Sequence, residues 1–345
     1  MTQKNTHTKT PKLRLPEFID EWEIEQFKNL TKINQGLQIP ISERYLEKVD
    51  NSHFYITNEF LKKGSEKKYF IKNPPESVLC EENDILMTRT GNTGMVVTNV
   101  SGAFHNNFFK ISYPEEIDKS FLYYFLNLTS TQKTIMRLAG TSTIPDLNHS
   151  DFYRIHFIFP LLNEQQKIAS FLSAVDKKLN LLQQKKALLE GYKKGVMQQI
   201  FPSTGSGQAP EIRFRSKDGG EYPEWECRIL KELLINYRLG GNYSNSDKVT
   251  SRPLIKMGNL GRGNISIDKV QYIEDNEVVD EIDRIKEGDL FFNTRNTLDL
   301  VGKVAIWKNE LPVAYYNSNL MLMEFSNNSF MNYRLNSFEG IKGLK

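Results

Sequence analysis

Apolar residues recur at alternating steps of four and three along one segment of the chain, residues 163–200. The stripe consists of Ile168, Leu172, Val175, Leu179, Leu182, Leu189, Val196 and Ile200. Lys186 and Lys193 fill its two missing places, and the segment contains no proline. This heptad pattern predicts a coiled-coil helix, about 57 Å long if straight, that pairs with another helix. The alternative, a helix lying on its own domain, is disfavoured because a small domain rarely covers about ten turns.

Before this segment, short apolar and β-branched runs alternate with turns rich in Gly, Pro and Asn. Strands are predicted at residues 53–57, 85–88, 95–100 and 108–112, and a helix at residues 118–138. The expected fold class is therefore α/β (α+β) and rich in strands.

Four stretches of the chain return later in the same order. Residues 11–22 (PKLRLPEFIDEW) match 210–225 (PEIRFRSKDGGEYPEW), 84–90 (DILMTRT) match 289–296 (DLFFNTRN), 104–107 (FHNN) match 315–319 (YYNSN), and 121–127 (FLYYFLN) match 330–336 (FMNYRLN). The spacing is 203 residues between Trp22 and Trp225 and 209 residues between Phe121 and Phe330, so it drifts by only a few residues. Two copies of one domain are predicted. They are expected at residues 1–160 and 211–345, with the helix at 161–202 and a small, polar linker at 203–210 between them.

The overall composition indicates which partners and which cellular compartment suit the protein. The formal net charge of +3 permits a nucleic-acid partner but does not demand one. Cys80 and Cys227 form neither a CxxC pair nor a disulfide framework, which suits a reducing compartment. No stretch approaches the roughly 20 apolar residues of a membrane helix. We expect a soluble, cytoplasmic protein without a membrane partner.

Two short motifs precede and open the long helix: residues 140–148 (GTSTIPDLN) and residues 159–168 (FPLLNEQQKI). This combination resembles the specificity (S) subunits of type I restriction-modification enzymes, and the resemblance covers nearly the whole chain. It implies two target-recognition domains, each reading half of a split DNA site and each followed by a helix, the two helices pairing antiparallel. It also implies a non-catalytic subunit without its own cofactor. Methyltransferase (M) subunits that bind S-adenosylmethionine dock on it, and a restriction (R) subunit uses ATP and Mg.

The chain departs from that family pattern in its second half. When Phe330 is aligned with Phe121, Lys345 falls opposite Met136, before any counterpart of residues 140–148 or of the long helix. We therefore expect an incomplete second domain and no second helix in this chain. The helix of a second copy is the expected substitute, which predicts a homodimer.

Polar, arginine-bearing loops follow equivalent strands in both copies and are the candidate DNA contacts. The candidates are Thr88, Arg89, Thr90, Asn92 and Thr93, their counterparts Thr294, Arg295, Asn296 and Thr297, the strand-end residues His105, Asn106, Asn107 and Asn317, and Lys62 and Lys63. Arginine holds guanine and asparagine holds adenine with two hydrogen bonds, whereas lysine suits phosphate. The alternatives are a structural turn whose arginine pairs with a carboxylate, satisfied strand ends, and a solvated lysine face.

The sequence carries no complete catalytic motif. Residues 73–76 (NPPE) lack the aromatic residue that adenine methyltransferases place fourth, and no glycine-rich cofactor loop follows a strand. The five histidines show no metal-ligand spacing. Two rival classes stay open: a DNA methyltransferase or nuclease with a fused recognition domain, and a coiled-coil scaffold without a DNA role. Titration with S-adenosylmethionine tests for the methyltransferase class, and a measurement of salt-dependent DNA binding tests for the scaffold class.

Overall fold

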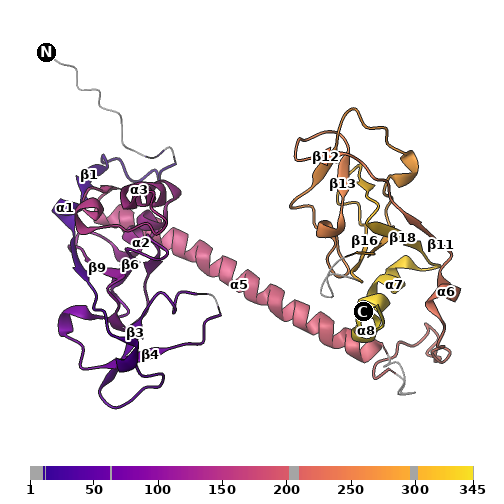
Figure 1. Cartoon of the computed structure of the whole chain (residues 1–345), viewed down its shortest axis with the longest axis horizontal. Helices are drawn as coiled ribbons and strands as arrows, with labels where there is room; N and C mark the ends of the chain where they lie inside the picture. Colours follow the sequence, from indigo (N-terminus) through magenta and orange to yellow (C-terminus); the bar gives the residue numbers. More distant parts are fainter. Residues whose placement is uncertain (1–10, 12, 63, 202–209, 296–301, 345) are drawn as a thin grey trace. The chain divides into compact units, whose positions relative to one another are not determined.

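The computed structural model describes residues 11, 13–62, 64–201, 210–295 and 302–344. The chain divides into two compact units, Met1–Leu182 and Gln183–Lys345, each built from strands and helices (Figure 1). The long helix α5 (Leu162–Ile200) contributes residues to both units, and it lies inside the region 161–202 expected for it. The predicted mixed fold class and the long helix are confirmed.

Unit 1 contains two four-stranded sheets and a strand pair. The first sheet has the order β2 (Lys32–Gln35), β9 (Phe108–Ser112), β6 (Ile85–Thr88), β7 (Val96–Val97) and is antiparallel. The second has the order β4 (Tyr69–Lys72), β3 (Ser52–Ile56), β8 (Gly102–Phe104), β5 (Leu79–Cys80), with β3 and β8 parallel. Strand β1 (Glu23–Gln26) pairs with β10 (His156–Phe159). Most neighbours in these sheets are therefore distant in sequence.

Unit 1 contains short helices, and polar side chains cap the N-termini of α2 (Lys119–Asn127) and α4 (His149–Phe152). The other helices are α1 (Phe27–Leu30) and α3 (Thr129–Ala139), with 3-10 turns η1 (Ile41–Glu43) and η2 (Glu76–Val78). The single helix predicted at residues 118–138 is thus two helices, because Leu128 between them has an extended ψ of 137°. Asp118 caps α2, and Asn148 caps α4, each by accepting a backbone N–H bond at 2.9 Å.

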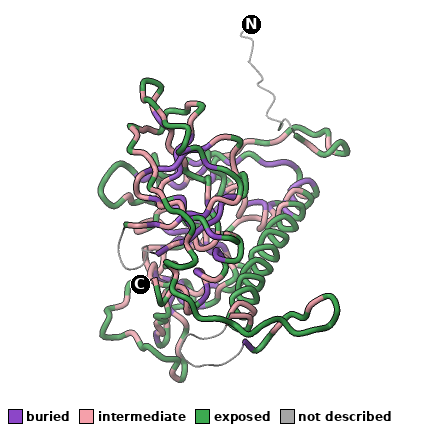
Figure 2. The backbone as a smooth tube through the Cα atoms, turned by 90° about the vertical axis from the view of Figure 1, so that its right-hand side faces the viewer, coloured by how far each residue is buried: buried purple, intermediate pink, exposed green. Residues whose placement is uncertain are grey.

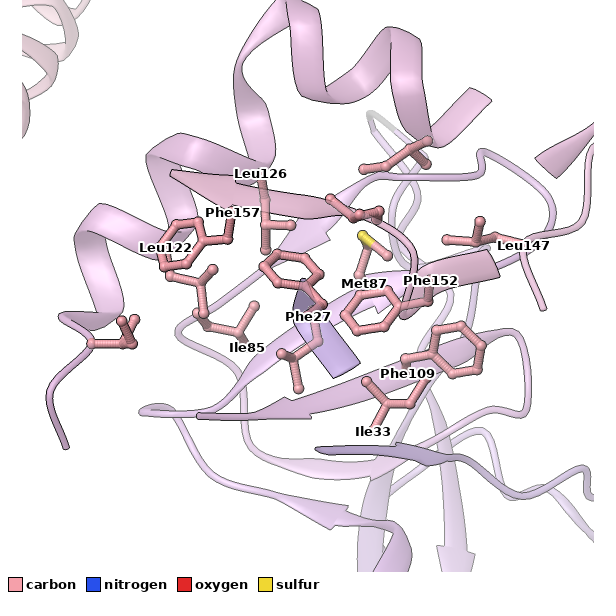
Figure 3. Packing of buried hydrophobic residues seen from close by; sticks show 14 of the residues in the cluster. Phe27, Ile33, Ile85, Met87, Phe109, Leu122, Leu126, Leu147, Phe152 and Phe157 are labelled. Carbon is pink, nitrogen blue, oxygen red and sulfur yellow. The ribbon is translucent and has the colours of Figure 1, made fainter. Parts of the chain in front are cut away.

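The core of unit 1 fills both faces of the first sheet. Ile85 and Met87 point to the cluster around Phe27, which the helices and β10 complete (Figure 3). Leu86, between them in sequence, belongs to a second cluster with Ile56 from the other sheet. This alternation follows from the two-residue period of a strand, and it explains why β6 reads as a continuous apolar run.

Unit 2 repeats this plan. Its first sheet has the order β11 (Asn236–Leu239), β18 (Leu320–Glu324), β15 (Leu290–Asn293), β16 (Val304–Ile306), and its second β12 (Asn245–Ser246), β14 (Gln271–Ile273), β13 (Pro253–Ile255), β17 (Tyr315–Tyr316). The remaining elements are α6 (Leu230–Leu233), α7 (Asn328–Leu335), α8 (Phe338–Leu344), η3 (Met257–Asn259) and η4 (Glu281–Asp283). The pair β13 and β17 is parallel, like β3 and β8. The predicted duplication is confirmed.

One backbone contact recurs in both units and requires glycine. A Cβ atom on Gly36 would lie 2.1 Å from the carbonyl oxygen of Phe104, and one on Gly240 would lie 2.3 Å from that of Tyr316. No side chain fits at such a distance. Glycine therefore allows the backbone just after β2 to approach the turn that follows β8 in unit 1. It allows the backbone just after β11 to approach the turn that follows β17 in unit 2.

Much of helix α5 is exposed (Figure 2). Within the described part of the chain, no helix combines the length and the apolar character needed to cross a membrane.

Candidate nucleic-acid interface

The loop after β6 in unit 1, residues 88–94, is a closed turn. Thr88 is fully buried. Its Oγ1 donates to the carbonyl oxygen of Asn92 at 2.5 Å and accepts the N–H of Met95 at 2.9 Å. Gly91 and Gly94 have φ angles of 64° and 88°, which favour glycine. Thr88 thus supports the loop from inside, while Asn92 lies exposed at its tip.

Arg89 is held at the base of this loop by an acidic residue. Its Nη2 lies 2.7 Å from Oδ2 of Asp146, and its guanidinium lies 5.9 Å from the centre of the Phe109 ring. The arginine side chain is 18% exposed and that of Asp146 is 48% exposed. This geometry matches the alternative considered for the loop, a structural turn whose arginine pairs with a carboxylate. A base contact by Arg89 stays a prediction that requires this exposed pair to open.

The motif at residues 140–148 clamps the same loop. The N–H of Leu147 donates to the carbonyl oxygen of Arg89 at 2.8 Å, and Oγ1 of Thr93 donates to that of Pro145 at 2.6 Å. Thr90 forms a β-bridge with Asp146. The motif therefore joins the helical part of unit 1 to the candidate DNA-contacting loop.

The turn between β8 and β9 adjoins this loop. Nδ1 of His105 accepts the N–H of Asn107 at 3.1 Å, so this nitrogen carries no proton. Burial, with a smaller contribution from the positive charge of Arg44, lowers the pKa of His105 to about 4. Asn106 donates to Oε1 of Gln38 at 3.1 Å. His105 is thus a neutral acceptor that shapes the turn.

Asn107 connects this turn to the loop, because its carbonyl oxygen accepts the N–H of Arg89 at 2.7 Å. Unit 2 builds the same connection: the N–H of Thr294 donates to the carbonyl oxygen of Asn319 at 3.2 Å. Oδ1 of Asn317, which is buried, accepts the N–H of Asn319 at 3.3 Å, as Nδ1 of His105 does in unit 1.

The structure corrects the predicted pairing of the two arginines. Thr88 pairs with the first residue of β9, and Asn293 pairs with the first residue of β18. Thr294 is therefore the counterpart of Arg89, and Arg295, which is exposed, lies one position further on. The apolar alternation of the strands sets this register. Asn296 and Thr297 lie outside the described residues.

The lysine group lies on and beside the hairpin of β3 and β4. Lys62, Lys67, Lys68 and Lys72 are exposed, and Lys63 lies outside the described residues. Nζ of Lys62 is 3.8 Å from Glu59. Phosphate contact and a solvated face both suit these positions, so DNA contact by Lys62 stays a prediction.

A buried ion pair fixes the start of helix α5 on unit 1. Nε and Nη2 of Arg14 donate to the two carboxylate oxygens of Glu164 at 2.8 and 2.6 Å, and Nε1 of Trp22 donates to Oε1 at 3.3 Å. The Glu164 side chain is only 3% exposed. We call this arrangement the Arg14–Glu164 latch. Gln165, fully buried, donates to the carbonyl oxygens of Glu116 and Pro160 and completes the attachment.

The predicted helix-pairing stripe is covered at its ends and open in its centre. Ile168 packs on the core of unit 1, and Leu172 and Val196 are half-buried. The central residues Val175, Leu179, Leu182 and Leu189 are 41 to 56% exposed. An apolar surface suited to another helix is thus available along the middle of α5.

Comparison with known proteins identifies the family. The family model described as the type I restriction modification DNA specificity domain matches residues 19–191. This chain belongs to the type I restriction-modification DNA specificity family. It is 27% identical over 266 residues to the type I restriction enzyme MjaVIII specificity subunit of Methanocaldococcus jannaschii, covering 76% of this chain and 60% of that subunit. It is 32% identical over 128 residues to the putative MjaX specificity subunit of the same organism, covering 36% of this chain and 30% of that subunit.

The specificity-family fold also occurs in a solved structure. The crystal structure of the type I restriction-modification system S subunit from M. genitalium superimposes with a TM-score of 0.54 at 17% identity, covering 97% of this chain and 81% of that one. The likeness is one of fold.

Sequence reasoning missed Asp146 and Glu164 as partners of arginines. Both lie in motifs that carry the family resemblance, at residues 140–148 and 159–168, and Arg14 lies in the first repeated stretch. An acid in each motif and an arginine in each repeated segment were the available signals. Over the described residues, no group of three His, Cys, Asp or Glu side chains is placed to hold a metal ion.

Proposed function

We propose that this chain is the DNA sequence-specificity subunit of a type I restriction-modification complex. It binds a split DNA site through its two units, docks methyltransferase subunits and, through them, the restriction subunit, and catalyses no reaction itself. Family membership supports this role. The main structural observation behind this role is a backbone hydrogen bond that joins a polar loop to a turn in both units. It links Arg89 to Asn107 in unit 1 and Thr294 to Asn319 in unit 2. Two units with the same polar edge suit a site of two parts.

On this proposal the chemistry belongs to the partner subunits. S-adenosylmethionine would bind to the methyltransferase subunits, and ATP with Mg to the restriction subunit. Calorimetric titration of the purified chain with S-adenosylmethionine should give no heat of binding. Saturable binding would instead favour a methyltransferase with a fused recognition domain.

The DNA role is tested with Arg89→Ala in the reconstituted complex with methyltransferase subunits. If Arg89 contacts a base, affinity should fall by about 1 to 3 kcal/mol against its preferred base and specificity should relax at one position. A uniform loss across all sequences would assign Arg89 to phosphate. Arg154→Ala, which removes an exposed arginine paired with Asp151, is the matched control. A complex that shows no salt-dependent binding to double-stranded DNA would refute the DNA role.

We also infer that α5 pairs with the same helix of a second copy. The stripe is symmetric about residue 184, so an antiparallel copy places Leu179 opposite Leu189 and Leu182 opposite the aliphatic stem of Lys186. Burying each exposed leucine contributes roughly 1.5 to 3 kcal/mol before entropy is subtracted. A two-fold axis then relates the two copies.

Light scattering of the purified chain at micromolar concentration tests this pairing, and a monomer would refute it. Changing both Leu179 and Leu182 to Glu should dissociate the pair, whereas Leu188→Glu, which alters a 75% exposed residue outside the stripe, should not. Methylome mapping adds a second test. If the pair presents its two copies of unit 1 to DNA, the site is an inverted repeat of one half-site, whereas two unrelated halves show that unit 1 and unit 2 each read their own sequence.

A further inference from the structure

The turns that follow β8 and β17 are held by the same backbone bond and carry different side chains. The N–H of Asn106 donates to the carbonyl oxygen of Leu37 at 3.2 Å in unit 1, and the N–H of Ser318 donates to that of Gly241 at 2.9 Å in unit 2. Because the backbone fixes this position in both units, its side chain can differ without disturbing the turn. It is asparagine in unit 1 and serine in unit 2.

The amide of Asn106 is only half satisfied by the protein. Its Nδ2 donates to Oε1 of Gln38 at 3.1 Å, and this bond is exposed to solvent. Its Oδ1 is buried and has no hydrogen-bond partner among the described residues. A buried acceptor without a donor raises the free energy of the folded chain, and a ligand that supplies the donor removes that cost.

Other buried polar atoms without a partner lie beside this turn. Oδ1 of Asn58 and Nε of Arg89 have no hydrogen-bond partner among the described residues either. Nδ2 of Asn58 donates to the carbonyl oxygen of Thr90 at 3.0 Å, and the N–H of Arg89 donates to that of Asn107 at 2.7 Å, so both residues adjoin the turn. This concentration indicates that unit 1 offers polar groups here to a partner outside the chain.

We propose that Asn106 is a specificity-determining residue of unit 1 and reads an adenine in the major groove. The inference rests on the proposed function, the binding of double-stranded DNA. On binding, the amide turns away from Gln38, so that Oδ1 accepts a hydrogen bond from the N6 amino group and Nδ2 donates to N7. Adenine offers this donor and acceptor side by side, whereas guanine offers two acceptors on the same edge. The turn gives up one exposed hydrogen bond and brings the unpartnered oxygen to a donor.

The test uses the reconstituted complex with methyltransferase subunits and a double-stranded DNA library of random sequence. Sequencing of the bound duplexes gives the base preference at each position of the site. Asn106→Ala should erase a preference for adenine at one position, keep the preferences elsewhere, and weaken binding to the wild-type site roughly 5- to 150-fold. Ser318→Ala, which changes the equivalent residue of unit 2, is the matched control and should leave that position unchanged.

Modified bases separate a direct contact from a structural role. The analogue 7-deazaadenine lacks the N7 acceptor, and purine lacks the N6 amino group. At the identified position, each should weaken binding of the wild-type complex about fivefold and leave binding of the Asn106→Ala complex unchanged. Gln38→Ala removes the bond that holds the amide in the free chain and should keep the adenine preference.

Two results would overturn this inference while the proposed function stands. One is an Asn106→Ala complex with the base preferences of the wild type, and the other is an equal effect of the modified bases on both complexes. A wild-type complex without salt-dependent DNA binding would overturn the proposed function and this inference together.

Discussion

Removing Arg14 should destabilise unit 1 far more than removing its counterpart Arg213 destabilises unit 2. In Arg14→Ala, the Trp22 N–H is the one side-chain donor left to the Glu164 carboxylate among the described residues, and the Glu164 side chain is 3% exposed. In Arg213→Ala, the Glu224 carboxylate that loses its partner is already 81% exposed to solvent. The two substitutions are chemically identical and differ in the burial of the acid left behind.

The expected magnitudes follow from this difference. Leaving a buried charge without its partner costs about 3 to 5 kcal/mol, because the carboxylate has lost its hydration without compensation. Breaking an exposed ion pair costs less than about 1 kcal/mol. The double change Arg14→Ala with Glu164→Gln should cost less than the sum of the two single changes, since no uncompensated charge is left buried.

Hydrogen-exchange mass spectrometry in increasing urea is the suitable assay, because the chain has two units and one global transition cannot be assumed. Peptides covering residues 156–170 report on the start of α5, and peptides covering residues 320–335 report on unit 2. Arg14→Ala should lower the opening free energy of the first set only. Equal, small effects of Arg14→Ala and Arg213→Ala would refute the reasoning that burial gives the latch its strength.

Three further substitutions test the interface. Gly36→Ala should destabilise unit 1 by up to about 3 kcal/mol in urea unfolding, because its Cβ would lie 2.1 Å from a carbonyl oxygen. Gly258→Ala, with open space around it, should be tolerated. Equal effects of the two substitutions would contradict this reasoning. His105 has a pKa of about 4 against an ordinary 6.5, so the unfolded chain binds the proton first as the pH falls. Stability should therefore be lost between pH 6.5 and 4, and His105→Asn should remove that part of the pH dependence; parallel pH profiles would exclude the effect. Asp146→Asn should free Arg89 and strengthen DNA binding about two- to fivefold, the worth of one partly exposed ion pair. Unchanged anisotropy titrations would place Arg89 away from DNA.

The long helix and the duplication were predictable because each leaves a repeating pattern in the amino-acid sequence. The stripe on α5 needs only local periodicity, and the duplication needs only the order of four weak matches. The composition of residues 118–138 predicts one helix, whereas the structure interrupts it at Leu128, whose backbone is extended. Local preference decides the presence of these elements better than their ends.

The details of the candidate site could not be predicted in the same way. Arg89 and Asp146 are separated by 57 residues, and only the folded chain brings the two together. The assignment of Arg295 as the counterpart of Arg89 followed residue identity, but the sheet follows the alternation of buried side chains, which places Thr294 there. Long-range pairing and strand register therefore required the structure.

The turns at His105 and Asn317 carry a consequence for tracing the ancestry of such duplicated proteins. An imidazole nitrogen in one unit accepts the N–H of Asn107, and an amide oxygen in the other accepts the equivalent N–H of Asn319. The duplication has preserved a hydrogen-bond acceptor for the equivalent backbone N–H of each unit, and two unrelated side chains supply it. Substitution scores treat this exchange as divergence, so a comparison by residue type underestimates the kinship of the two halves, whereas a comparison by acceptor position recovers it.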